Sequence, residues 1–362
     1  MKEISKAQLA YDDFLIQTLN DSEFNYGSPT NLQKVKTEFN KKRHNPIFEY
    51  KYDTTEIEKI KHLLQSIHLK KEGNPDIHHL QKAFLKEKIT QAKMYSQLGT
   101  EQFTIHSKQI YGSPNTKLQE FAKEILNDTY KTVPKLPKIT AQTTMQKLRD
   151  GFKERGITGW SLKRVPMSAS ASVNTKTREL KLKSRERFQE PFVKRLIVHE
   201  IGTHVVRYEN GLMQPLKMFS IGTAGYLSTE EGLAVLSEEL AECSSETQMR
   251  NYAGRVLANT FAQEGSFLET YKNLREYFGH KDAFKLTVRS KRGIADTAEK
   301  GGLTKDHVYL KGYVAVKSYA KKNPLNDLYI GKIGLKDLKV IKKIEHIKEP
   351  KILPSFVLTK TA

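Results

Sequence analysis

Two histidines at positions 199 and 204 enclose a glutamate in a pattern that could bind a metal ion. The segment reads H-E-I-G-T-H, so Glu200 follows His199 directly and three residues separate Glu200 from His204. In the usual zinc motif on a helix, H-E-x-x-H, only two residues stand in that interval. The added residue must either abolish a metal site or belong to a helix whose shape accommodates it.

Helix geometry separates these two possibilities. Residues four apart on an α-helix are offset by about 40° and share a face, whereas residues five apart are offset by about 140°. His199 and His204 are five apart, so a regular helix would leave them as two separate histidines that only pack or hydrogen-bond. A π-turn, in which backbone bonds run from i to i+5, returns them to one face. A metal site therefore predicts a widened helix around Ile201–Thr203, with Gly202 inside the bulge.

A third ligand is available in Glu231, which lies 27 positions after His204. The run S-T-E-E-G-L-A over residues 228–234 is typical of a helix start, and zinc sites combine imidazoles with a carboxylate. The alternative is that Ser228 and Glu231 form a capping box, because acidic residues are favoured at a helix N-terminus. Both interpretations stay open at this point.

Two alternating segments before the motif predict a β-hairpin. Residues Met167–Val173 read M-S-A-S-A-S-V and residues Arg178–Lys183 read R-E-L-K-L-K, with four residues between them. A period of two indicates strands, although a Ser-Ala run can also be a flexible linker. The first strand would offer an edge to which an extended peptide could add. Apolar residues between Phe192 and Val198 then lead into the motif helix.

Helical periodicity dominates the first third of the chain and recurs later. Apolar residues spaced three and four apart, together with Ser, Asn, Gly and Pro at the ends of such stretches, indicate where helices begin and end. The expected helices include residues 56–67, 77–97, 115–130, 140–155 and 257–278, the last weakened at Gly265.

The segment 133–138, V-P-K-L-P-K, is a proline-marked connector and the best internal boundary. We therefore expect an α+β protein with a helical N-terminal region, residues 1–132, and a second region, residues 139–362, that carries the motif. The two regions are expected to pack as one unit.

A net charge of +20 is the unusual bulk property of this 362-residue chain. The charge fits either a lysine-rich surface on a soluble protein or an acidic partner, such as a protein tail rich in carboxylates. The basic residues form short clusters without a zinc-finger or RNA-binding signature, so no nucleic-acid partner is expected. No apolar run approaches the ~18 residues of a membrane span, and the single Cys243 favours a reducing, cytoplasmic setting.

The motif and the later T-E-E-G-L-A together resemble the QEGLA-motif metallopeptidase family, which includes the microtubule-associated tyrosine carboxypeptidases and bacterial proteins. The resemblance extends through most of the chain, although Glu230 stands where the bacterial motif usually has Gln. Further matching segments are residues 45–50, 99–112, 210–216, 292–293 and 306–312.

This resemblance implies a zincin-like fold, with a small sheet and two active-site helices. It also implies that His199, His204 and Glu231 bind one zinc ion and that Glu200 is the general base. That assignment agrees with the chemistry of amide hydrolysis, in which zinc lowers the pKa of a water molecule and a carboxylate takes its proton. The change at Glu230 should leave the ligand after it in place.

Substrate-binding residues are expected in the C-terminal third. Arg289 and Arg292 are candidates for holding a terminal carboxylate, and the alternative is a solvated basic run. Tyr309 could donate to the oxyanion of the tetrahedral intermediate, or could simply pack.

The sequence thus predicts a zinc carboxypeptidase that removes a C-terminal residue, tyrosine or another bulky one, from a protein or peptide. The +20 charge would suit an acidic tail. Two alternatives stay open: a zinc endopeptidase or other amide hydrolase, and a basic binding protein without turnover on the same scaffold.

Overall fold

The computed structural model describes residues 3–20, 27–128, 136–167 and 170–358. Helices make up most of this part of the chain, and one small three-stranded sheet completes it. The expected α+β class is confirmed at this level. Within the described residues, no helix has both the length and the apolar character that crossing a bilayer requires.

The elements follow one another in a simple order, with helices first, then the sheet, then helices again. Before the sheet lie α1 (Lys6–Asn20), α2 (Leu32–Lys41), α3 (Thr54–Gln65), α4 (Pro75–Ser96), α5 (Glu101–Tyr111), α6 (Thr116–Asn127) and α7 (Ala141–Lys153). The sheet consists of β1 (Ser161–Val165), β2 (Ala171–Asn174) and β3 (Glu179–Lys183). After it come α8 (Glu190–Leu196), the π-helix η1 (Ile197–Val205), α9 (Val206–Leu212), α10 (Met218–Ile221), α11 (Leu227–Leu240), α12 (Glu246–Glu264), α13 (Phe267–Leu274), α14 (His280–Lys291), η2 (Lys305–His307), α15 (Val308–Ala320), η3 (Asn326–Tyr329), α16 (Leu338–Ile341) and α17 (Ser355–Leu358).

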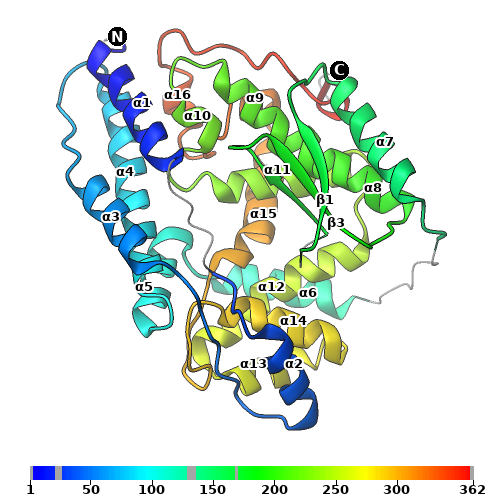
Figure 1. Ribbon diagram of the computed structural model, residues 1–362. Coiled ribbons are helices and arrows are strands. Elements are labelled where there is room, and N and C mark those ends of the chain that lie inside the picture. Colours follow the sequence, from blue (N-terminus) through cyan, green and yellow to red (C-terminus); the bar gives the residue numbers. More distant parts are fainter. Residues whose placement is uncertain (1–2, 21–26, 129–135, 168–169, 359–362) are drawn as a thin grey trace.

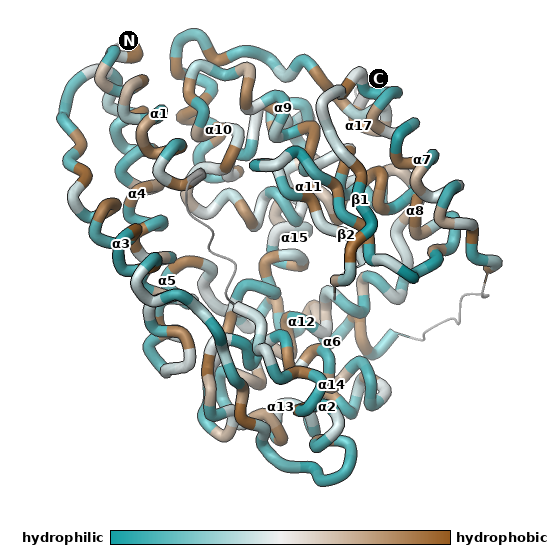
Figure 2. The backbone as a smooth tube through the Cα atoms, in the orientation of Figure 1, coloured by the Kyte–Doolittle hydropathy of each residue, from teal (hydrophilic) through white to brown (hydrophobic). Residues whose placement is uncertain are grey.

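The helices predicted over 56–67, 77–97, 115–130 and 140–155 form close to these bounds, with residues 129–130 outside the described residues, and the ends of these helices have local causes. The side chain of Asp53 accepts from two backbone amides at the start of α3, and Asn74 does the same for α4 just before Pro75. The single helix expected over 257–278 is wrong, because α12 ends before Gly265 and Ser266 caps a separate helix, α13, through a capping box. Along α3 and α4, hydrophobic and hydrophilic stretches alternate, as expected of helices with one buried face (Figure 2).

The predicted hairpin is present, and the sheet has one strand more than predicted. β2 pairs antiparallel with β3, while β1 pairs parallel with β3 on its other side, which gives the order β1-β3-β2. Leu180 and Leu182 of β3 are buried and alternate with more exposed lysines. β2 begins at Ala171, later than expected, and residues 168–169 of the predicted strand lie outside the described residues. β2 is an edge strand, although peptide addition to it stays a prediction.

The N-terminal helices are distributed over the molecule (Figure 1). Helices α1, α3, α4 and α5 form the flank opposite the sheet, whereas α2 lies beside α13 and α14. Phe39 of α2 contacts Phe267 of α13 edge-on, with ring centroids 5.2 Å apart. Arg250 of α12 donates to the carbonyl of Leu126 in α6 at 2.7 Å. One hydrophobic core therefore includes both predicted regions, and the boundary between residues 132 and 139 stays a prediction. Residues 133–135 of the connector lie outside the described residues.

Candidate metal centre

The motif helix is a π-helix over Ile197–Val205, continuous with α8 before it and α9 after it. The widening predicted around Ile201–Thr203 is confirmed. It brings the rings of His199 and His204 to a centroid separation of 4.9 Å, nearly perpendicular to each other. Gly202 lies within the π-helix, but a Cβ there would meet only ordinary contacts, the nearest being the Ile197 carbonyl oxygen at 3.5 Å. The π-turn therefore does not depend on glycine at this position.

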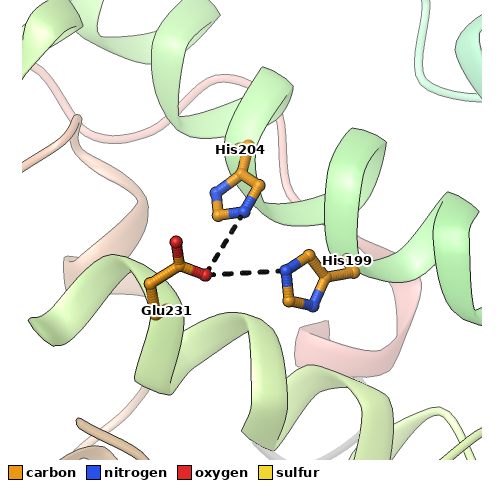
Figure 3. Close-up of side chains that lie close together, drawn as sticks. All are labelled: His199, His204 and Glu231. Carbon is orange, nitrogen blue, oxygen red and sulfur yellow. Dashed lines mark ion pairs between the residues drawn. The ribbon is translucent and has the colours of Figure 1, made fainter. Parts of the chain in front are cut away.

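Glu231 approaches the histidine pair from α11. Its Oε2 lies 3.6 Å from Nε2 of His199 and 3.7 Å from Nε2 of His204 (Figure 3). One donor atom from each of the three residues lies within 4.8 Å of the others. The capping-box alternative is wrong, because α11 begins at Leu227 and its N-cap, Tyr226, accepts no side-chain cap bond. Glu231 thus points at the histidines from inside the first turns of the helix.

Each histidine turns its other ring nitrogen to a buried carboxylate. His199 Nδ1 lies 2.7 Å from Glu238 Oε1, and His204 Nδ1 lies 2.8 Å from Glu230 Oε1. A carboxylate at Nδ1 favours the tautomer with the proton on that nitrogen, which leaves the Nε2 lone pair for an ion. Both imidazoles are therefore oriented as metal-bound histidines are in proteins.

Cations in turn hold these two carboxylates. Arg195 donates to Glu238 Oε1 at 3.0 Å, and the hydroxyl of Tyr252 donates to the same oxygen at 3.3 Å. Glu230 pairs with Arg207, which is fully buried, and with Lys332, whose Nζ lies 3.2 Å away.

Sequence reasoning missed these supporting residues. One signal was available: Glu238 follows Glu231 by seven positions, which is two helical turns and the same face. Lys332, which pairs with Glu230, is distant in the sequence and therefore carries no such local signal.

The electrostatics of the site favour a positive charge between the three donors. Burial alone would lower the pKa of the His199 imidazole, yet the Glu231 and Glu238 carboxylates outweigh it and raise that pKa to about 10. Burial tends to raise the pKa of Glu231, but its interactions with both histidines lower it to about 2. A group of carboxylates that attracts a proton so strongly will also attract a cation.

The donor set fits zinc. Glu231 Oε2 is buried and has no hydrogen-bond partner among the described residues. A buried carboxylate oxygen without such a partner lowers the stability of a protein, so a bound cation is expected at this atom. Two neutral imidazoles and one carboxylate, with a fourth position open, are the ligands of many catalytic zinc ions. These residues could therefore hold zinc.

Glu200 is half-buried at the position after His199. In the described part of the chain its carboxylate makes no hydrogen bond or ion pair with another residue. It is thus available to accept a proton, which is what the predicted general base requires.

A cationic wall stands near the histidine pair. We use this name for Arg289 and Arg292, which pair with the buried carboxylate of Asp306, together with Lys305, which precedes Asp306 in the chain. Arg289 donates to Asp306 through Nε at 2.6 Å and Nη2 at 2.9 Å, and Arg292 Nη2 lies 3.6 Å from the same carboxylate. The Lys305 charge is among those that lower the pKa of Glu231, which connects the wall to the candidate centre.

Tyr309 is close enough to both Glu231 and Asp306 for their charges to act on its hydroxyl. Its ring stacks on that of Tyr252 at a centroid distance of 5.3 Å. Burial, reinforced by the negative charge of Glu231, raises the pKa of the Tyr309 hydroxyl well above its usual value. The hydroxyl therefore keeps its proton at neutral pH and can act as a donor.

Comparison with known proteins assigns the family. Residues 37–361 match the family described as "Microtubule-associated tyrosine carboxypeptidase". The chain belongs to this family. The match includes the π-helix, Glu231 and the cationic wall, and it confirms the resemblance found in the sequence.

Named members of the tyrosine carboxypeptidase family are similar over part of the chain. The putative tyrosine carboxypeptidase MATCAP2 of Mus musculus is 29% identical over 175 residues, which is 46% of this chain and 33% of that protein. Microtubule-associated tyrosine carboxypeptidase 1 is 29% identical over 157 residues in Rattus norvegicus, 41% of this chain and 32% of that protein. The Homo sapiens protein of that name is 34% identical over 128 residues, 33% of this chain and 26% of that protein. The alignments thus span about a third of the length of these relatives.

Proposed function

We propose that this protein is a zinc-dependent carboxypeptidase that removes a C-terminal residue, tyrosine or another bulky one, from a protein substrate. The convergence of His199, His204 and Glu231 carries the proposal, because Glu231 Oε2 faces both Nε2 atoms without a hydrogen bond of its own among the described residues. Family membership supports the reaction, since the relatives are named tyrosine carboxypeptidases. The arrangement of a small sheet with two helices that bear the ligands agrees with a zincin-like domain.

Glu200 and Tyr309 would have separate roles in the reaction. A bound zinc ion would lower the pKa of a water molecule and polarise the scissile carbonyl. Glu200 would take the proton of that water and deliver it to the leaving amine. Tyr309, which keeps its proton, would donate to the oxygen that becomes negative in the transition state.

The cationic wall supports a substrate that carries negative charge. Arg289 and Arg292 together exceed the charge of Asp306, so a net positive field acts beside the ligands. This field would attract a C-terminal carboxylate and an acidic tail before it. A cytoplasmic protein tail is the substrate class that we propose.

Release of the C-terminal residue from a synthetic peptide ending in tyrosine tests the reaction. We expect tyrosine release that a zinc chelator abolishes and added zinc restores. The Glu200→Gln protein should bind zinc and lose at least 1,000-fold in rate, on the order of what removing a general base does. Retained release in that variant would contradict the proposed role of Glu200.

Mass spectrometry of the products separates the competing functions. Single-residue losses from the C-terminus support a carboxypeptidase, whereas internal cuts indicate an endopeptidase. Bound zinc without any turnover would indicate a binding protein on the same scaffold.

A further inference from the structure

Five arginines gather near the candidate centre, and four of them have carboxylate partners. Arg195 pairs with Glu238, Arg207 with Glu230, and both Arg289 and Arg292 with Asp306. Arg255 of α12 is different, because no carboxylate among the described residues lies within ion-pair distance of its guanidinium.

Aromatic rings hold Arg255 in place. Its guanidinium carbon lies 4.4 Å from the centroid of the Tyr309 ring and 5.3 Å from that of Tyr252. These two rings are stacked nearly parallel, at an interplanar angle of 10°. Stacking on aromatic faces fixes a guanidinium without occupying its N–H groups. Arg255 is therefore positioned and still able to donate.

The same aromatic pair connects Arg255 to the candidate ligands. The Tyr252 hydroxyl donates to Glu238 Oε1 at 3.3 Å, and that oxygen also accepts from His199 Nδ1 at 2.7 Å. Arg255 is thus linked to His199 through Tyr252 and Glu238.

One nitrogen of Arg255 lacks a partner that it needs. Nη1 is buried and makes no hydrogen bond within the described residues. A buried, charged donor without an acceptor is strongly unfavourable, and the planar fork of a guanidinium matches a carboxylate in a two-point contact. The missing partner is therefore best supplied by a carboxylate ligand.

We propose that Arg255 is the residue that binds the terminal carboxylate of the substrate. This inference rests on the proposed carboxypeptidase function. Arg289 already gives two donors to Asp306. Arg292 forms an ion pair with the same carboxylate at 3.6 Å and donates from Nε to the Arg289 carbonyl at 3.0 Å. The two arginines named from the sequence would then supply a fixed positive field while Arg255 makes the specific contact.

Lys305 is the competing candidate. It is half-buried and adjoins Asp306, and its ammonium makes no hydrogen bond or ion pair within the described residues. An ammonium is a point charge that does not match both carboxylate oxygens at once. Geometry therefore favours Arg255, and the two side chains can be compared by the same experiment.

Two peptides that differ only at the C-terminus test the proposal: one ends in tyrosine with a free carboxylate and the other in tyrosine amide. With the zinc-loaded parent protein we expect kcat/KM to favour the acid. In Arg255→Gln, KM for the acid should rise roughly 10- to 100-fold, the loss of a charge-assisted contact, with a smaller change in kcat. The acid-over-amide preference should nearly disappear, while Lys305→Gln should retain most of it.

Thermal unfolding and zinc content establish that Arg255→Gln is folded and loaded, and Arg255→Lys should restore only part of the preference. If Arg255→Gln keeps the full preference, or if Lys305→Gln loses it, the inference is wrong even though tyrosine release continues.

Binding separates this inference from the proposed function. Calorimetry of both peptides with zinc-loaded Glu200→Gln protein measures recognition without turnover. If the parent releases no residue from any peptide, the carboxypeptidase proposal fails. If the Glu200→Gln protein binds the acid more tightly than the amide, and adding Arg255→Gln removes this difference, the carboxylate site is still supported. If the Glu200→Gln protein binds both peptides equally well, the carboxylate site is overturned.

Discussion

Gly232 of α11 lies against Gly312 of α15, so that the two helix backbones are in contact one residue after Glu231. A Cβ built on Gly232 would overlap the backbone of Gly312, and one on Gly312 would overlap the Ser228 carbonyl oxygen. Both glycines are buried. The close crossing fixes where the first turns of α11 stand, and hence where the Glu231 carboxylate meets the histidine pair.

Gly232→Ala should lower the free energy of unfolding by about 1–3 kcal/mol, the range for overpacking a core, and weaken zinc binding by displacing Glu231. Urea denaturation and competition with a zinc-sensitive dye measure the two effects. Gly202→Ala is the matched control, because a Cβ there meets ordinary contacts. The control should be neutral or slightly stabilising, as Gly-to-Ala changes in helices are. Equal destabilisation by both variants would contradict the role of the crossing.

Glu230→Gln should destabilise the protein by roughly 3 kcal/mol, because it leaves the buried charges of Arg207 and Lys332 without their anion. Zinc affinity should also fall about 10-fold, since Glu230 orients His204. Chemical denaturation and zinc titration check the two numbers.

Glu239→Gln is the matched control for Glu230→Gln on the same helix. Its side chain is 41% exposed and pairs with the exposed Lys317, so the expected loss is below about 1 kcal/mol. Adding Lys332→Met to Glu230→Gln should recover part of the stability, because it removes one unpaired charge. Failure of this second change to recover any stability would argue against the charge explanation.

Deleting Gly202 should preserve the zinc site. The deletion converts the motif into H-E-I-T-H, in which residues four apart share a face of a regular α-helix, offset by about 40°. A π-turn differs from an α-turn by one additional residue, so the flanking helices α8 and α9 can keep their orientation. We expect zinc bound at one equivalent and an unchanged or higher thermal midpoint. Deleting Ala234 from the regular helix α11 should instead unfold the protein.

Asp12 should make stability fall as the pH rises from about 4 to 7. The side chain is 1% exposed, and its carboxylate accepts from the backbone amides of Lys217 and Met218 at the start of α10. Burial raises the pKa of Asp12 to about 7, against the opposing effect of these amides. Because the pKa is higher in the folded than in the unfolded chain, the folded state binds more protons in this window and loses that advantage at higher pH.

Asp12→Asn removes this pH dependence. The free energy of unfolding of the variant minus that of the parent should increase by on the order of 2 kcal/mol from pH 5 to pH 8. Urea midpoints at both pH values measure the difference. Asp13→Asn, which alters the exposed neighbour that pairs with Lys217, should change stability equally at both values. A parallel response of the two variants would contradict the effect of burial.

The sequence by itself determined the local parts of this protein. The five-residue interval between His199 and His204 required a π-helix for a shared face, and the π-helix is present. The helices over 56–67 and 77–97 could be predicted because their signals, apolar spacing and side-chain caps, lie within a few residues of one another. Gly265 was recognised as a weak point, but the Ser266 capping box that makes it a complete break was not.

Tertiary structure decided which charges and backbones meet. Glu230 pairs with a lysine about 100 positions later, and β1 joins β3 in parallel rather than its neighbour β2. It also paired Asp306 with Arg289 and Arg292, and it stacked the Arg255 guanidinium on two tyrosine rings without an ion-pair partner among the described residues. These choices depend on a packed core that brings distant segments together, and a side chain's partner is set by that packing rather than by its neighbours in sequence.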